Sequence, residues 1–175
     1  MAGPIEIDVW QGEIAELEVD ALVVPANESL FMTVGAAASV KRRGGEKIER
    51  EAVDQGPRPP GTAVATNGGA LAAPYVIHAI GVGHDRVANR QRLADAVKAA
   101  LAFAEPLQLR RVAFSLVGVE HGTFTPTEAA AVLAEELTSP EIAATALECF
   151  VVATANPAET RAVTDALAAR RAAVT

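Results

Sequence analysis

Residues that build disulfides, metal sites and aromatic surfaces are scarce in this sequence. Its 175 residues include one cysteine, one tryptophan, one tyrosine and three histidines. The single cysteine, Cys149, excludes an intrachain disulfide, and its place in an apolar run predicts a small core residue rather than a nucleophile. The histidines and the cysteine are too far apart to match the ligand spacing of a metal site. We therefore expect no metal and no cofactor.

Positive charge and long apolar runs are also in short supply. Lys and Arg total 15 against 22 Asp and Glu, a formal net charge of −7, which disfavours nucleic acid as a partner. The basic cluster Lys41-Arg42-Arg43 ends a predicted helix, where cations complement the helix dipole. No apolar run approaches the roughly 18 residues of a membrane span, and the N-terminal segment lacks the apolar core of a signal peptide. We expect a cytoplasmic protein without a membrane partner.

Short apolar segments alternate with helical segments through most of the chain, half of which is hydrophobic. The pattern predicts strands over Ile5–Trp10, Ala21–Val24, Thr62–Thr66, Tyr75–Ile80, Arg111–Val117 and Glu148–Ala153. It predicts helices over Ala36–Arg43, Glu46–Val53 and Ala88–Glu105, a fourth that starts at Thr125, and a fifth from Asn156 to about Arg171. The third and fourth strands are joined without a helix, which makes the sheet mixed. The sequence predicts one domain over residues 1–175, a three-layer α/β/α sandwich around a mixed central sheet.

Two predicted loops, residues 25–35 and 118–124, follow buried strands and carry glycine. Ligands of α/β sheets bind beyond the carboxyl ends of strands, in loops that lead into helices. Gly35 starts a small-residue helix, so it either presents N–H groups to an anion or only turns the chain. Of the histidines, His121 is best placed for chemistry, His78 falls inside a strand and is expected in the core, and His84 has no evident partner.

Four segments, in order along nearly the whole chain, resemble the macrodomain family, whose members bind ADP-ribose and in some cases hydrolyse its derivatives. Residues 11–14 and 19–27 are similar to the family pattern GDI…DAIVNAAN, and residues 35–45 to its glycine loop and small-residue helix. Residues 61–79 are similar to GEAVVT…L…YVIHAV, and residues 112–118 to the strand that enters the second phosphate loop. The resemblance implies a macrodomain fold and ADP-ribose, or a related nucleotide, as ligand.

The resemblance also implies ligand-binding residues. Glu13 and Ile14 match the adenine end, and Asn27 matches the second Asn of NAAN, near the distal ribose. Gly35 and Ala36 match the end of the loop whose N–H groups face the diphosphate. The second phosphate loop corresponds to Gly118, Val119, Glu120, His121, Gly122 and Thr123, and Phe124 to an apolar position that borders the distal ribose.

Several positions depart from the family pattern. Thr33 and Val34 replace loop glycines, Glu120 brings a carboxylate to the phosphate loop, and no aromatic residue follows the last strand. Ala37 stands where hydrolysing members have an acid, and neither loop offers an evident substitute. We therefore expect weak ADP-ribose binding without efficient catalysis. Two alternatives stay open: a hydrolase of ADP-ribosyl or O-acyl-ADP-ribose esters, and a degenerate domain that acts as a scaffold.

Overall fold

A six-stranded mixed sheet is the centre of the computed structural model, which describes residues 4–174. The strands, in sheet order, are β1 (Glu6–Gln11), β6 (Cys149–Thr154), β5 (Arg111–Ser115), β2 (Ala21–Pro25), β4 (Tyr75–Ile80) and β3 (Thr62–Asn67). All neighbours pair in parallel except β3, which runs antiparallel to β4 at one edge. The predicted mixed sheet is therefore confirmed.

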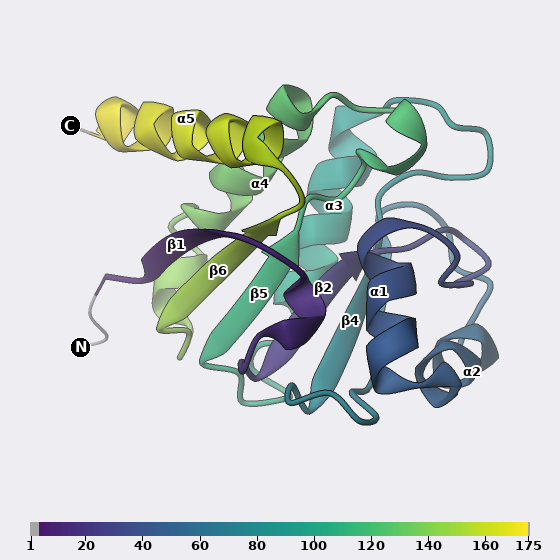
Figure 1. Ribbon diagram of the computed structural model, residues 1–175. Helices are drawn as coiled ribbons and strands as arrows, with labels where there is room; N and C mark the ends of the chain where they lie inside the picture. Colours follow the sequence, from purple (N-terminus) through teal and green to yellow (C-terminus); the bar gives the residue numbers. More distant parts are fainter. Residues whose placement is uncertain (1–3, 175) are drawn as a thin grey trace.

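Five helices cover the two faces of this sheet (Figure 1). They are α1 (Gly35–Gly44), α2 (Glu46–Asp54), α3 (Arg90–Leu101), α4 (Pro126–Leu137) and α5 (Pro157–Val174). Helix α1 packs over β2 on one face with α2 beside it, while α3, α4 and α5 pack together on the other. The side chains of a strand alternate between the faces, so Val23 joins one hydrophobic cluster and Leu22 the other. This arrangement is the three-layer sandwich that the sequence predicts.

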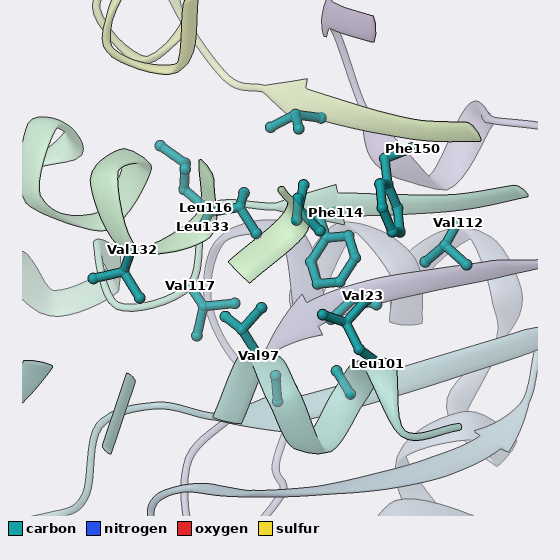
Figure 2. Close-up of a cluster of buried hydrophobic side chains, with 14 of the residues drawn as sticks. Val23, Val97, Leu101, Val112, Phe114, Leu116, Val117, Val132, Leu133 and Phe150 are labelled. Carbon is teal, nitrogen blue, oxygen red and sulfur yellow. The ribbon is translucent and has the colours of Figure 1, made fainter. Parts of the chain in front are cut away.

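The larger hydrophobic cluster lies between the sheet and α3, α4 and α5 (Figure 2). Phe114 of β5 and Phe150 of β6 meet edge to face, with ring centroids 5.9 Å apart and an interplanar angle of 73°. Both are completely buried, and such a pair adds about 0.5–1.5 kcal/mol to the stabilisation from buried area alone. This packing anchors β5, and thereby the start of the loop that follows it.

Several element boundaries differ from the sequence-based expectation. Strand β5 ends at Ser115 instead of Val117; Leu116 and Val117 are buried but lie outside the ladder. Helix α3 begins only at Arg90, because the side chain of Asn89 caps it by accepting the N–H of Arg92. The 3₁₀ turns η1 (Ile14–Glu16), η2 (Glu120–Gly122) and η3 (Ile142–Ala144) were not predicted, since single turns have no hydrophobic period. Among residues 4–174, no helix has the length and apolarity to cross a bilayer.

Helix α4 begins with a capping box, which fixes the end of the second loop. Thr125 Oγ1 accepts the N–H of Glu128 at 3.2 Å, and the Glu128 carboxylate accepts the N–H of Thr125 at 2.8 Å. We expect Thr125→Ala to lower the free energy of unfolding by about 1 kcal/mol, because one N–H at the helix start loses its acceptor. Urea denaturation measures the change. Thr127→Ala, an exposed position in the same turn, is the matched control, and an equal loss in both variants would contradict the capping argument.

Candidate functional site

Two cavities adjoin beyond the carboxyl ends of the central strands. The large cavity, of about 570 Å³, lies between η1, the start of α1 and the ends of β5 and β6. The small cavity, of about 320 Å³, lies between the loop after β2, residues 82–86 and η2. Pro25 and Glu120 line both cavities. The two loops singled out from the sequence therefore meet at one site.

The start of helix α1 faces the large cavity through Gly35 and Ala36. Gly35 has φ +57°, a conformation that favours glycine, and an added Cβ there would meet no atom within 4 Å. The first hydrogen bond of the helix runs from the N–H of Ala38 to Val34 O at 3.2 Å. The N–H groups of Gly35, Ala36 and Ala37 precede that bond, so they remain as donors at the positive end of the helix dipole. Gly35 thus turns the chain and also presents donors to the cavity.

The carboxylate of Glu120 sits on the second loop where the two cavities meet. It accepts the N–H of Gly118 through both oxygens, at 3.1 and 3.3 Å. Gly118 itself has φ +97°, and a Cβ there would come within 2.8 Å of the Phe124 ring. Burial raises the pKa of Glu120 to about 7, backbone hydrogen bonds to its carboxylate oppose the rise, and the negative charge of Glu159 adds to it. A donor of the second loop is thus already bonded to an internal carboxylate whose charge depends on pH near neutrality.

The charged residues divide unevenly between the cavities. The large cavity holds the carboxylates of Glu13, Glu120 and Glu159 and the guanidinium of Arg42. Glu13 is engaged by two cations, because it accepts from Arg42 at 3.3 Å and from Arg43 at 2.8 Å. In the small cavity, the charged and titratable residues besides Glu120 are Arg86, His84 and His121. Its electrostatic environment therefore favours an anion more than that of the large cavity.

Two buried oxygens in the cavity walls have no hydrogen-bond partner among the described residues. They are Asn27 Oδ1, in the small cavity, and Ser39 Oγ, in the large one. The amide of Asn27 is oriented by its Nδ2, which donates to Phe31 O at 3.0 Å. A buried polar atom without a partner costs about 1–3 kcal/mol. Each oxygen belongs to a residue that lines a cavity, and a donor that reached it would remove this cost.

The predicted site residues separate into cavity-lining and supporting positions. Those on the cavity walls are Glu13, Ile14, Gly35, Ala36 and Val119 in the large cavity, Asn27 and His121 in the small one, and Glu120 in both. The residues outside both linings are Gly118, Gly122, Thr123 and Phe124. Phe124 is only 7 % exposed and packs in the larger hydrophobic cluster. The structure thus places it under the second loop, where it supports Gly118, rather than on the cavity wall.

Sequence reasoning missed a cluster on the small cavity. It found no partner for His84, but His84 Nδ1 lies 3.0 Å from Glu28 Oε2 and its Nε2 lies 3.3 Å from Ser29 Oγ. Residues 28 and 84 are far apart in the sequence, and only the pairing of β2 with β4 brings their loops together. The expectation for His78 is confirmed: it is 1 % exposed and pairs with Thr66 Oγ1 at 3.0 Å, and burial lowers its pKa to about 4.

Metal-binding side chains do not cluster in the part of the chain that the structure describes. Across residues 4–174 no three His, Cys, Asp or Glu side chains come together as a metal site. The polar groups that line the two cavities include carboxylates, histidines, hydroxyl groups and the backbone at the start of α1.

Known proteins share this sequence pattern and this fold. A family model described as Macro domain matches residues 23–133. An uncharacterised protein of Aquifex aeolicus is 37 % identical over 134 residues, which cover 76 % of this chain and 81 % of that one. A mutant of the Oceanobacillus iheyensis macrodomain superposes with a TM-score of 0.87 at 18 % identity and covers 99 % of this chain and 98 % of its own. The Trypanosoma brucei macrodomain in complex with ADP-ribose gives 0.81 at 22 % identity, over 91 % of this chain and 68 % of that one.

The raised pKa of Glu120 predicts a pH-dependent stability. Between its usual pKa of 4.5 and about 7, the folded protein binds more protons than the unfolded chain, so stability falls as pH rises through this window. We expect Glu120→Gln to abolish this fall. The difference in free energy of unfolding, variant minus parent, should rise by on the order of 2 kcal/mol between about pH 5 and about pH 8. Urea denaturation across the pH range measures it.

The buried His78 acts in the opposite sense, because its contribution is lost as pH falls below 6.5 towards about 4. It is present in both proteins, so the difference between them isolates Glu120. Glu105→Gln, at an exposed position, is the matched control. Parallel pH profiles for the parent and Glu120→Gln would show that folding does not raise the pKa of Glu120.

Proposed function

Because the chain belongs to the macro domain family, we propose that its two adjoining cavities bind ADP-ribose or a related nucleotide. The observation that carries this proposal is the start of α1, where the N–H groups of Gly35, Ala36 and Ala37 remain as donors at a cavity wall. Diphosphates bind to such helix starts through backbone N–H groups and the helix dipole. The Trypanosoma brucei macrodomain, which shares the fold, is known in complex with ADP-ribose.

The two cavities suit the two ends of such a ligand. In this proposal the adenosine lies in the large cavity, with adenine near Ile14 and Glu13. The diphosphate lies at Gly35 and Ala36, and the distal ribose enters the small cavity. There the free Oδ1 of Asn27 accepts a ribose hydroxyl. The geometry supports this order, because the start of α1 stands between the η1 end of the site and the small cavity.

The same site argues for weak affinity. The carboxylates of Glu120 and Glu159 stand in the cavity that has to accept a diphosphate, and the β-branched Thr33 and Val34 replace glycines that allow close backbone approach. At the end of β6, Thr154 and Ala155 line the large cavity without an aromatic ring to stack on adenine. Ala37, at the position of the family acid, offers no proton for ADP-ribosyl ester hydrolysis. We propose a binding module rather than an efficient ADP-ribosyl hydrolase.

Glu120 gives the sharpest test of this binding proposal. Removing its charge should tighten ADP-ribose binding by roughly fivefold, because a like charge near the diphosphate costs on the order of 1 kcal/mol. We expect Glu120→Gln to show this gain in calorimetric titrations at about pH 8 and low salt. Most of the gain should disappear at about pH 6, where protonation leaves the parent side chain uncharged as well. Higher salt should also shrink the gain.

The pH comparison needs the difference between the two proteins. The other charged and titratable residues of the two cavities are the same in both, so the difference isolates Glu120; they are Glu13, Glu159, Arg42, Arg86, His84 and His121. Equal affinities of parent and variant at every pH would refute the electrostatic account. Weaker binding by Glu120→Gln would mean that the carboxylate accepts a ligand hydroxyl and is a recognition residue.

Asn27 separates a working site from a scaffold. We expect Asn27→Ala to weaken ADP-ribose binding by roughly tenfold, because the ligand loses a hydrogen bond in a buried wall, worth about 1–1.5 kcal/mol. Asn67→Ala, at the exposed end of β3, is the matched control. If neither the parent nor Glu120→Gln binds ADP-ribose at millimolar concentration, the domain is a scaffold, and the binding proposal is wrong.

A further inference from the structure

A glutamate and a serine in the turn that follows β2 form a connected row with a histidine in the loop that follows β4. Ser29 Oγ lies 3.3 Å from His84 Nε2, and His84 Nδ1 lies 3.0 Å from Glu28 Oε2. A carboxylate can only accept a hydrogen bond, so Nδ1 carries the proton that faces Glu28. Neutral His84 then presents the lone pair of Nε2 to the hydroxyl of Ser29. This is the order of groups that activates a serine as a nucleophile.

Backbone hydrogen bonds fix the turn that carries Glu28 and Ser29. The N–H of Leu30 donates to Asn27 O at 3.0 Å, which closes a turn with Glu28 and Ser29 at its centre. Leu30, completely buried against the sheet, anchors the turn. Glu28 is fixed from two further sides, since its O accepts the N–H of Arg58 at 3.0 Å and its Oε2 accepts the N–H of His84 at 3.1 Å. The orienting group is therefore tied to both neighbouring loops.

Backbone strain gathers at the same place. Four described non-glycine residues have a positive φ, and three of them belong to the walls or the support of the small cavity: Leu30 at 65°, Arg86 at 53° and His121 at 66°. Such conformations cost about 1–3 kcal/mol each and persist where the surrounding structure enforces them, often at functional sites. These three positions lie in the three loops that meet at the small cavity.

We propose that Ser29, His84 and Glu28 form an acyl-transfer site that cleaves carboxylic esters in the small cavity. Ser29 and His84 line this cavity together with Phe31 and Val34. Those two apolar side chains are 51 % and 41 % exposed, so an apolar acyl group would cover them. Arg86 supplies positive charge to the same cavity. The substrate class is an ester of a small apolar carboxylic acid, and this inference does not need the nucleotide site.

The reaction runs in two balanced steps. Ser29 Oγ attacks the ester carbonyl carbon while its proton passes to His84 Nε2. The bond from carbon to the alcohol oxygen then breaks, and His84 returns the proton to that oxygen, which leaves an acylated Ser29 and the free alcohol. In the second step, His84 takes a proton from water, the hydroxide attacks the acyl group, and the carboxylic acid departs as Ser29 regains its hydrogen.

The probe is a small alkyl fluorophosphonate, which phosphonylates an activated serine and expels fluoride. We expect one adduct per chain, mapped to Ser29 by peptide mass spectrometry, and slow hydrolysis of p-nitrophenyl butyrate by the unlabelled protein. Ser29→Ala should take up no label. His84→Gln should label about 100-fold more slowly, because it removes the general base. Ser139→Ala, at a half-buried serine in the turn after α4 and outside both cavities, is the matched control and should label like the parent.

Two variants of Glu28 test its assigned role. Glu28 acts through His84 as a positioning residue: Glu28→Gln should slow labelling by about 10-fold, and Glu28→Asp, which keeps a carboxylate, should recover part of the rate. Melting temperatures close to that of the parent show that each variant is folded.

The proposal is overturned by either of two results. The first is no adduct, or an adduct on another serine. The second is a His84→Gln variant that labels at the parent rate. Because the probe contains no nucleotide, each of these outcomes is separate from the success or failure of ADP-ribose binding.

Discussion

The parallel pairing of β2 with both β4 and β5 is the constraint on which the site depends. The first four residues of β2, Ala21 to Val24, have no exposed surface at all, so the strand can neither slip nor leave the centre of the sheet. Parallel strands deliver their carboxyl ends to one edge, and the loops after β2, β4 and β5 must meet there. Asn27, His84 and Glu120, which are distant in sequence, line one cavity for this reason.

Where these loops meet, polar groups enter a partly desolvated space and need hydrogen-bond partners. Two carboxylates act as acceptors there, in different ways. Glu28 accepts from the ring and the backbone of His84 and remains in contact with solvent. Glu120 accepts from Gly118 but is buried enough that its pKa rises to about 7. The first carboxylate therefore orients a neighbour, while the charge of the second can be removed by a proton near neutral pH.

Those parts of the molecule that follow local rules could be predicted from the sequence. The apolar, β-branched composition of Tyr75–Ile80 identifies a strand, and the Thr-Pro pair at the start of α4 identifies a helix. The pattern of buried strands and glycines identified the two loops, and most of the positions that the family resemblance implied line one of the two cavities. The role of Phe124 as a support, the free oxygen of Ser39 and the partners of His84 could not be predicted, because each depends on side-chain direction or on loops that only the sheet brings together. A lone histidine in a loop has no local signature.

The departures from the family pattern change the way in which the site can interact with a ligand. A glycine loop binds phosphate through backbone donors and needs little from its side chains. Here Thr33 and Val34 stiffen that loop, and Glu120 bonds a donor of the other. At the same end of the sheet, Glu28, Ser29 and His84 form a connected row, and Arg86 makes no ion pair with any of the described residues. Under the two proposals the site relies less on its backbone and more on these side chains, which lie in loops that the buried strand β2 allows to vary without loss of the fold.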